Sequence, residues 1–335
     1  MTKVFTAISV KNLVLLYMNT SQAFVYALTH LNRAATKFGK APHKPVLLLT
    51  LLELMESGYA MENRFYPDTE LVGVFQENWR LLVDTAHHAD FTQPFYYLQS
   101  EHADGERYWE LIPMPGCQVN AHIKSIHTLI NVVAYGQFSD ALYSYLSDAA
   151  NRAFVRQLLI GTYFPAKAQV FAMQKQRGQG YYHELKAYIL NTPEARKKVI
   201  RVETEEEVYV RGGLFKRLVP KVYGQTCAVS GMQVDSTFGH TFVDACHIVP
   251  FSVSHDDRVT NGLALCPNIH RAFDRGLIGI DDDYMVLLSP HIREKAEHAY
   301  NLSKFGGAQI LLPQQRSAWP DVDLLRWHRR EVFRR

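Results

Sequence analysis

Three short stretches near the C-terminal end of the sequence decide the predicted fold. Residues 245–250 read Ala-Cys-His-Ile-Val-Pro, residues 261–266 read Asn-Gly-Leu-Ala-Leu-Cys, and residues 270–276 read His-Arg-Ala-Phe-Asp-Arg-Gly. The β-prone residues 242–248, which end at a proline, predict a strand, and residues 226–229 are its expected partner across the turn Ser230-Gly231. Pro267 and Gly276 predict the start and end of a short helix. The segment therefore predicts a hairpin, then a loop, then a helix.

This predicted arrangement brings together side chains suited to phosphodiester hydrolysis. His270 and Asp274 are four residues apart, so a helix places them on one face where they can bind one cation. Histidine has an unperturbed pKa of about 6.5 and can take a proton from water. A divalent cation can neutralise charge on a phosphate. We expect His247, Asn261 and His270 to be catalytic, with His247 as general base and Asn261 orienting it by a hydrogen bond across the loop. Mg²⁺ or Mn²⁺ is the expected cofactor.

The third protein ligand of this cation has two candidate sources. Cys246 stands immediately before His247, and Asp244 lies two residues earlier, on the same face of the predicted strand as Cys246. Either Asp244 or a water molecule could complete the coordination. We name Asp244 as the candidate, together with His270 and Asp274.

The four cysteines do not predict a structural zinc site. Cys227 is followed three positions later by Ser230, and Cys266 has no second cysteine nearby. A closed zinc site needs four well-spaced ligands. Four scattered cysteines also form no disulfide framework, which indicates a reducing, cytoplasmic compartment. We expect no structural zinc, and buried thiols instead.

The composition indicates a folded protein of two domains. The chain has 335 residues, of which 47% are hydrophobic and 21% charged, and its formal net charge is +3. This balance supports buried cores and argues against extensive disorder, and a single core seldom organises so long a chain. A charge this small does not identify a polyanion-binding protein. Polar residues interrupt the apolar N-terminal segment, so we expect no membrane span.

Apolar periodicity predicts a mainly helical N-terminal half with a small sheet, so the fold class is α+β. Helices are expected over residues 21–38, 46–57, 69–82, 139–146 and 149–159, and a hairpin of residues 94–99 with residues 107–112 across the turn Asp104-Gly105. The helix over 46–57, with Pro45 in its first turn, is apolar on nearly every side and should be buried.

Three regions follow from these elements. We expect residues 18–166 to form an N-terminal domain, residues 167–210 a linker and connecting helix, and residues 211–335 a second domain. The polar stretch 169–180 marks the linker, and the acidic run 203–207 is typical of a solvated face. Met18 could equally be the first residue, because helix-capping side chains follow it.

Residues 212–290 resemble the His-Asn-His (HNH) domain of McrA-like, modification-dependent restriction endonucleases, whose metal site lies in a small ββα unit. The matching motifs lie at residues 215–217, 227–231, 246–250, 261–263, 270–274 and 278–281. Where many such sites have Asp or His beside the base histidine, this chain has Cys246. The resemblance implies a metal-dependent DNA endonuclease.

The N-terminal half resembles the sulfur-recognition domain of phosphorothioate-dependent type IV restriction enzymes of the EcoWI type. The resemblance rests on residues 41–49, on Pro94, Phe95 and Leu98, and on residues 109–111. It implies a hydrophobic cavity for the sulfur at Pro94, flanked by Gln93, Phe95 and Tyr97, with His43 and Lys44 on the DNA backbone. Sulfur is larger and less strongly hydrated than oxygen, so an apolar cavity favours it. Gln93 stands where the pattern often has an aromatic residue, and Tyr97 where it has a small one, so the cavity could be reshaped or fit another mark.

Together these resemblances imply a restriction endonuclease that binds phosphorothioate-modified double-stranded DNA and cuts nearby. Because cutting both strands needs two active sites or two events, a homodimer is expected. One alternative is an HNH endonuclease that depends on another mark, such as methylcytosine, or on none. The other is a non-cleaving reader of modified DNA whose metal site has decayed, as Cys246 would suggest.

Overall fold

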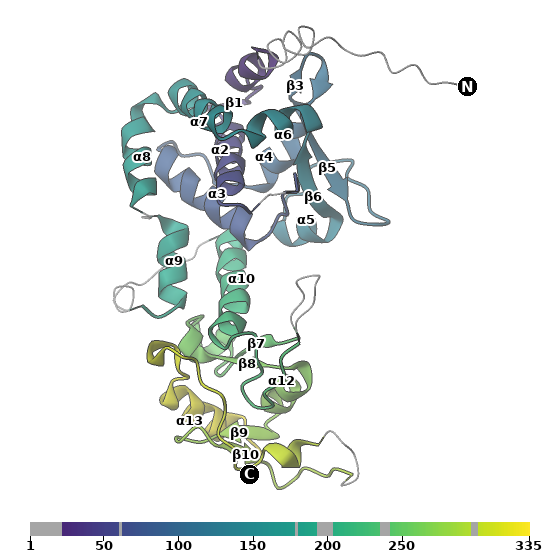
Figure 1. The fold of residues 1–335 in the computed structure, drawn as a ribbon, viewed down its shortest axis with the longest axis vertical. Coiled ribbons are helices and arrows are strands. Elements are labelled where there is room, and N and C mark those ends of the chain that lie inside the picture. Colours follow the sequence, from purple (N-terminus) through teal and green to yellow (C-terminus); the bar gives the residue numbers. More distant parts are fainter. Residues whose placement is uncertain (1–21, 60–61, 178–179, 193–203, 235–241, 296–300) are drawn as a thin grey trace, which may run out of the picture. The chain divides into compact units, whose positions relative to one another are not determined.

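The computed structural model describes all residues except 1–21, 60–61, 178–179, 193–203, 235–241 and 296–300 (Figure 1). The chain divides into two compact units. Unit 1 comprises Met1–Tyr182 and Glu203–Val210, and unit 2 comprises His183–Val202 and Arg211–Arg335. The alternative start at Met18 lies outside the described residues. Helices with small antiparallel strand pairs make up both units, consistent with the predicted α+β class.

Unit 1 is mainly helical. After a helical segment over residues 22–29, its helices are α2 (His43–Glu56), α3 (Thr69–Leu82), α4 (Thr92–Tyr97), α5 (Ile126–Val132), α6 (Asp140–Ser147), α7 (Ala149–Tyr163) and α8 (Ala168–Gln176), with 3-10 turns η1 (Leu98–Ser100) and η2 (Pro165–Lys167). Its strand pairs are β1 (Ala35–Thr36) with β2 (Gly39–Lys40), β3 (His102–Ala103) with β4 (Glu106–Arg107), and β5 (Trp109–Pro113) with β6 (Val133–Phe138).

Helix α2 is the buried centre of unit 1, and it packs against α3, α4 and α7 (Figure 1). Every residue from His43 to Leu52 is buried. A helix that is apolar on nearly all sides needs neighbours on all sides. The prediction of a buried helix here is confirmed, although the helix already begins at His43.

Two predicted elements at the edges of unit 1 are different in the structure. The first helix ends at residue 29 instead of residue 38, and β1 and β2 form a hairpin in its place. Gly39 has φ = 104°, so it serves the hairpin turn and not a helix cap. The polar stretch expected to be a linker contains helix α8.

The predicted strand over residues 94–99 is wrong. These residues lie in α4 and η1, and β5 pairs with β6, which is distant in the sequence. Phe91, Phe95 and Leu98 are fully buried at a spacing of four and three residues, which is the period of a helix. Aromatic β-propensity was therefore outweighed by burial. The Asp104-Gly105 turn is present, but it joins only the short β3 and β4.

The predicted solvated acidic face is also wrong, because Glu206 and Glu207 are buried. The Glu206 carboxyl group accepts hydrogen bonds from the Phe91 amide (2.7 Å) and from the Gln76 side chain, and Glu207 pairs with Arg80. Burial raises the pKa of Glu206 to about 8. These contacts belong to the first turn of α10 (Glu205–Val222).

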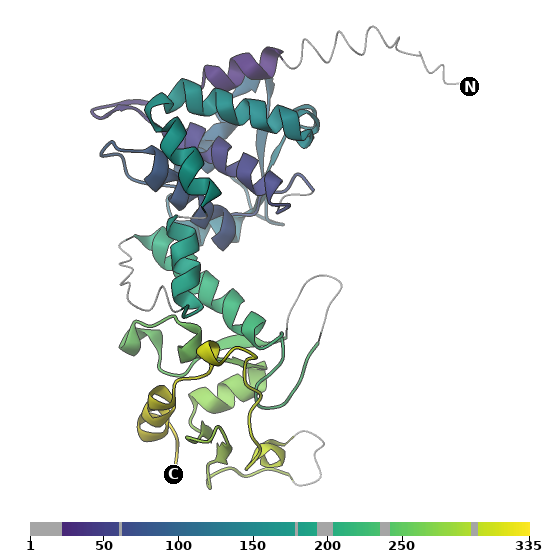
Figure 2. The ribbon, with the colours of Figure 1, turned by 60° about the vertical axis from the view of Figure 1, so that its left-hand side comes forward.

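Unit 2 contains the rest of α10, most of α9 (Tyr181–Ile189), and further small elements (Figure 2). Its strand pairs are β7 (Asp244–His247) with β8 (Gly262–Leu265) and β9 (Ile278–Ile280) with β10 (Val286–Leu288); its other helices are α11 (Phe251–Ser254), α12 (Pro267–Asp274) and α13 (Val322–Glu331), with 3-10 turns η3 (Val259–Asn261), η4 (Leu302–Phe305) and η5 (Arg316–Ala318). Within the described part of the chain, we find no helix that combines the length and apolarity needed to cross a membrane.

The partner of β7 differs from the predicted one. Cys246 lies opposite Leu263 and His247 opposite Gly262, so the partner is β8, which was expected to be loop. Thr226 forms an isolated bridge with Gln233, and the residues between them form a tight turn. The helix after Cys266 is confirmed, with Pro267 in its first turn and the positive φ of Gly276 after its end.

Substituting Glu206 should flatten the pH dependence of stability. With its pKa raised to about 8, Glu206 keeps a proton in the folded state that the unfolded chain releases near the ordinary pKa of 4.5. The contribution of Glu206 to the free energy of unfolding is complete below the pKa that Glu206 has in the unfolded chain. It is lost as pH rises through the pKa that Glu206 has in the folded state. Between about pH 6 and about pH 8.5, the melting temperature should fall less in Glu206→Gln than in the wild type. The exposed neighbour Glu205→Gln is the control, and equal slopes for all three proteins would contradict this account.

Candidate active site

A pocket of about 360 Å³ in unit 2 lies where β7, α12 and α13 meet. It is lined by Ala245, His247, Ile248, Pro250, Phe251, His270, Asp274, His328 and Val332. Three of the five residues expected at the nuclease centre, His247, His270 and Asp274, therefore line one pocket. Asp244 is not among the lining residues, and Asn261 is fully buried.

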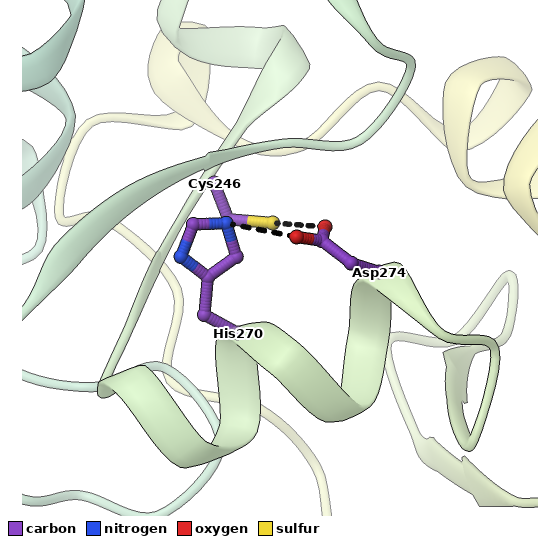
Figure 3. A group of neighbouring side chains, drawn as sticks. All are labelled: Cys246, His270 and Asp274. Carbon is purple, nitrogen blue, oxygen red and sulfur yellow. Dashed lines mark hydrogen bonds and ion pairs between the residues drawn. The ribbon is translucent and has the colours of Figure 1, made fainter.

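Three side chains could hold a metal ion at this pocket. The donor atoms of Cys246, His270 and Asp274 all lie within 4.8 Å of one another. Figure 3 shows His270 and Asp274 extending from α12 toward Cys246 on the neighbouring strand. Nε2 of His270 is 3.4 Å from Oδ2 of Asp274, and the Cys246 thiol lies 3.7 Å from Oδ1 of the same carboxylate. Imidazole, thiolate and carboxylate are the ligands of divalent transition metals, so the donor set fits such a cation.

The Cys246 thiol has an unusual environment for a ligand. It is fully buried, and burial raises its pKa, while the adjacent Asp274 carboxylate raises the pKa further. Without a cation the thiol is therefore protonated. Because a coordinating thiol loses its proton, cation binding at this group should release a proton to solvent.

Asp244, predicted as the third ligand, lies beside His270 but outside the candidate ligand group. Its Oδ2 lies 3.6 Å from Nδ1 of His270, on the ring nitrogen opposite the one that faces Asp274. The candidate ligand group contains Cys246 in its stead. A carboxylate on the second nitrogen of a ligating histidine fixes the orientation of the ring. This geometry suits Asp244 to orient His270 better than to bind the cation.

His247 is held on two sides by residues of unit 2. Its ring stacks on Phe215 of α10, with centroids 3.8 Å apart and an interplanar angle of 7°. Its Nε2 lies 2.7 Å from Oδ1 of Asp257. Because a carboxylate only accepts, Nε2–H donates, and the neutral ring keeps its lone pair on Nδ1. A side chain 26% exposed and lining the pocket can then accept a proton there.

Asn261 does not form the expected hydrogen bond across the loop to His247. Its Oδ1 accepts from the Val249 amide (2.9 Å), and its Nδ2 donates to the carbonyl oxygens of Val249 (3.0 Å) and Asp256 (2.9 Å). These bonds close the loop that follows His247. Among the described residues, the side chain that contacts Nε2 of His247 is that of Asp257 instead.

Sequence reasoning missed Asp257 and the residue behind it, Arg211. The Arg211 guanidinium forms an ion pair with the second oxygen of Asp257, Nε to Oδ2 2.8 Å. Asp257 sits in a polar loop beside a second aspartate, Asp256, and Arg211 lies on α10 outside every motif. Periodicity and spacing carry no signal for such a long-range pair.

His328 of α13 was also not anticipated at this pocket. Its ring stacks on Phe273, with centroids 3.7 Å apart, and its Nε2 donates to the Phe273 carbonyl (3.1 Å). Burial lowers the pKa of His328 to about 4, so the ring is neutral near pH 7. We see in it a packing residue that closes one wall of the pocket.

Cys227, Ser230 and Cys266 lie together elsewhere in unit 2. The Ser230 amide donates to the Cys227 sulfur (3.4 Å), and the Ser230 hydroxyl is 3.8 Å from the Cys266 sulfur. The Cys266 thiol donates to Cys227, which lowers the pKa of Cys227. Ser230 thus contacts both buried sulfur atoms.

A second pocket, of about 400 Å³, lies in unit 1. It is lined by Asn32, Arg33, Ala34, Ala41, His43, Lys44, Gln93, Pro94, Tyr97 and Ser100. Five of the six residues predicted to bind modified DNA line it together. The sixth, Phe95, packs in the core against Phe91 and Trp109 instead.

The two basic side chains predicted to contact DNA are engaged within unit 1. Lys44 is 8% exposed, pairs with Glu101 and donates to Ser100 (2.9 Å). Nε2 of His43 donates to the His88 carbonyl (2.9 Å), and burial lowers the pKa of His43. Neither group offers a free positive charge. Arg33, stacked 4.6 Å above the Tyr163 ring, is the other basic residue at this pocket.

Comparison with known proteins agrees with the geometry of unit 2. Residues 227–281 match the family described as HNH endonuclease. The chain carries an HNH endonuclease domain. The match contains the strand pair, α12 and all of the candidate metal-binding side chains, and it supports the prediction of a nuclease.

Two relatives match over part of the chain. The type IV methyl-directed restriction enzyme EcoKMcrA of Escherichia coli (strain K12) is 31% identical over 84 residues, which are 24% of this chain and 30% of that protein. A solved structure titled modification-dependent TagI restriction endonuclease is 24% identical and covers 35% of this chain and 37% of its own, with a TM-score of 0.27. Such a score does not establish a shared fold, and the chain spans less than half of either relative.

Replacing Cys246 by aspartate should change the metal preference of the HNH domain. Oxygen ligands favour Mg²⁺, whereas a thiolate favours softer ions. In Cys246→Asp, the ratio of DNA cleavage rates with Mg²⁺ and with Co²⁺ should rise several-fold over the wild type. Cys117→Ser, in unit 1, is the control that should keep the wild-type ratio. An unchanged ratio in Cys246→Asp would show that residue 246 does not contact the ion.

Proposed function

We propose that this protein is a modification-dependent restriction endonuclease: unit 1 binds phosphorothioate-modified double-stranded DNA, and unit 2 hydrolyses a phosphodiester bond nearby. The observation that carries the proposal is the convergence of His247, His270 and Asp274 on one pocket inside the HNH match.

The hydrolytic step begins with His247. With Nε2–H donated to Asp257, the Nδ1 lone pair takes a proton from the attacking water. His270 and Asp274, with the Cys246 sulfur, would hold the divalent cation, and Asp244 would orient the His270 ring. When bound, the cation supplies charge neutralisation at the phosphate and the leaving oxygen. Asn261 fixes the loop that follows the base.

The pocket of unit 1 supports recognition of a soft, weakly hydrated group. Ala34, Ala41, Pro94 and Tyr97 give it apolar walls. A phosphate oxygen loses strong hydration in such a place, whereas sulfur loses less, so the pocket discriminates between them. Tyr97 is 47% exposed and can fold over the bound group.

We assign the phosphate contact of this pocket to Arg33 in place of Lys44. Lys44 is buried in its pair with Glu101, and breaking a buried pair is costly. The Arg33 guanidinium lines the pocket and presents several donors that suit a phosphate. Two such chains, one for each strand, would form a homodimer, which gives a double-strand cut.

Another mark remains the second candidate substrate because EcoKMcrA, which matches part of this chain, is a methyl-directed enzyme by name. Recognition of methylcytosine requires a pocket that can hold a base, and the pocket of unit 1 has a volume of about 400 Å³.

The third candidate function is binding of modified DNA without cleavage. It requires that the candidate metal group be inactive.

One plasmid prepared with and without phosphorothioate tests the substrate. Cleavage of the modified plasmid should require a divalent metal ion, stop with EDTA and disappear in His247→Ala, while DNA binding persists in both cases. The unmodified plasmid should stay intact. Cleavage of a cytosine-methylated plasmid alone would favour the second substrate, and binding without any cleavage would favour the reader.

Arg33→Gln separates phosphate contact from recognition of the mark within the same assay. It should weaken binding of modified and unmodified DNA alike, and lower the slope of log affinity against log salt by about one. Arg64→Gln, an exposed arginine of unit 1 that lies outside the pocket, is the matched control.

A further inference from the structure

The contacts around His247 form a continuous series that ends on α10. Nε2 of His247 meets Oδ1 of Asp257 at 2.7 Å, and Oδ2 of the same carboxylate meets Nε of Arg211 at 2.8 Å. Oδ1 thus faces the imidazole in a hydrogen bond, whereas Oδ2 faces the guanidinium in an ion pair in which Nε–H forms no hydrogen bond. Asp257 is only 3% exposed, and a carboxylate so deeply buried is stable only where charged or donating groups surround it.

We propose that Asp257 is the positioning residue of the catalytic histidine, and that Arg211 in turn fixes Asp257. The inference rests on the proposed function, because it assigns a task within hydrolysis at His247. Asp257 is not one of the three candidate metal-binding residues, and it contacts the base itself, so we assign it an action through the imidazole. It holds the proton on Nε2 and leaves Nδ1 free to accept one.

The surroundings of Asp257 and Arg211 limit their freedom. Arg211 lies 4.2 Å above the Phe251 ring, which belongs to the helix that follows His247. Asp257 lies between α11 and η3, and the Asn261 amide holds the carbonyl of the preceding residue, Asp256, at 2.9 Å. Asn261 therefore orients His247 indirectly, since it fixes the loop that presents Asp257.

Phe215 supplies the remaining constraint. Its ring lies parallel to the imidazole at 3.8 Å and prevents His247 from tilting, while Asp257 fixes the rotation of the ring within its own plane. Arg211 and Phe215 are four residues apart on α10, so they share one face of that helix. One helix face thus sets both the plane and the tautomer of the base.

The isosteric variant Asp257→Asn tests the positioning role. Its single amide oxygen can face either Arg211 or His247. Because the guanidinium has only donors, we expect the oxygen to face Arg211. The amide NH₂ then faces Nε2 and favours the tautomer with the proton on Nδ1. We expect kcat on DNA to fall on the order of 100-fold or more, with KM, DNA affinity and melting temperature close to the wild type.

A spectroscopic readout separates this proposal from the proposed function. The ¹⁵N shifts of the His247 side chain, assigned by loss of the signal in His247→Ala, should report Nε2–H in the wild type and Nδ1–H in Asp257→Asn. This measurement needs no cleavage activity. If the wild type cuts no DNA but the tautomer changes, the proposed function fails and the positioning role stands.

Two further variants complete the test. Arg211→Gln should lower kcat in the wild-type background and have little additional effect in Asp257→Asn, because both act through one carboxylate. Asp282→Asn, in an arginine-paired carboxylate of unit 2 outside the pocket, should keep wild-type activity. An unchanged tautomer in Asp257→Asn, or a loss of kcat matched by a loss of folded structure, would overturn the proposal.

Discussion

The antiparallel pairing of β7 with β8 fixes the geometry on which the nuclease centre depends. It sets His247 opposite Gly262, and β8 runs directly into α12, which carries His270 and Asp274. A Cβ on Gly262 would lie 2.6 Å from Val219 of α10, so the glycine lets that helix approach the strand pair closely. A slip by one residue would turn His247 to the other face of the pair and away from α12.

The two pockets depend on burial in different ways. In unit 2, burial keeps the Cys246 thiol protonated until a cation arrives, and it keeps His328 neutral. In unit 1, Lys44 is buried in α2 and pairs with Glu101. Its charge is therefore not available for the DNA contact that the sequence predicted. A basic residue in a motif is therefore a candidate for DNA contact only where its charge is free.

Elements with a strong local signal were predictable, and pairings over long distances were not. Pro267 and Gly276 mark α12 because their backbone preferences act locally, and the apolar run of α2 identifies a buried helix. The partner of β7 was misassigned because the short apolar run of β8 has no alternating pattern to mark it as a strand. In unit 1, the β-propensity of the aromatic residues in α4 favoured a strand. The structure is a helix because the buried residues recur at helical spacing. The side chains of the candidate site share this limit: the motif gave His247, His270 and Asp274, whereas Asp257 and Arg211 meet only after folding.

The central claim is that His247, His270 and Asp274 form one single-metal centre. Crystals of the protein soaked in Mn²⁺ test it directly through the anomalous scattering of the ion. The account predicts one strong peak at bonding distance from His270 Nε2 and an Asp274 oxygen, in the pocket that His247 lines. A peak bound elsewhere, such as at Cys227 and Cys266, with none between His270 and Asp274, would contradict it.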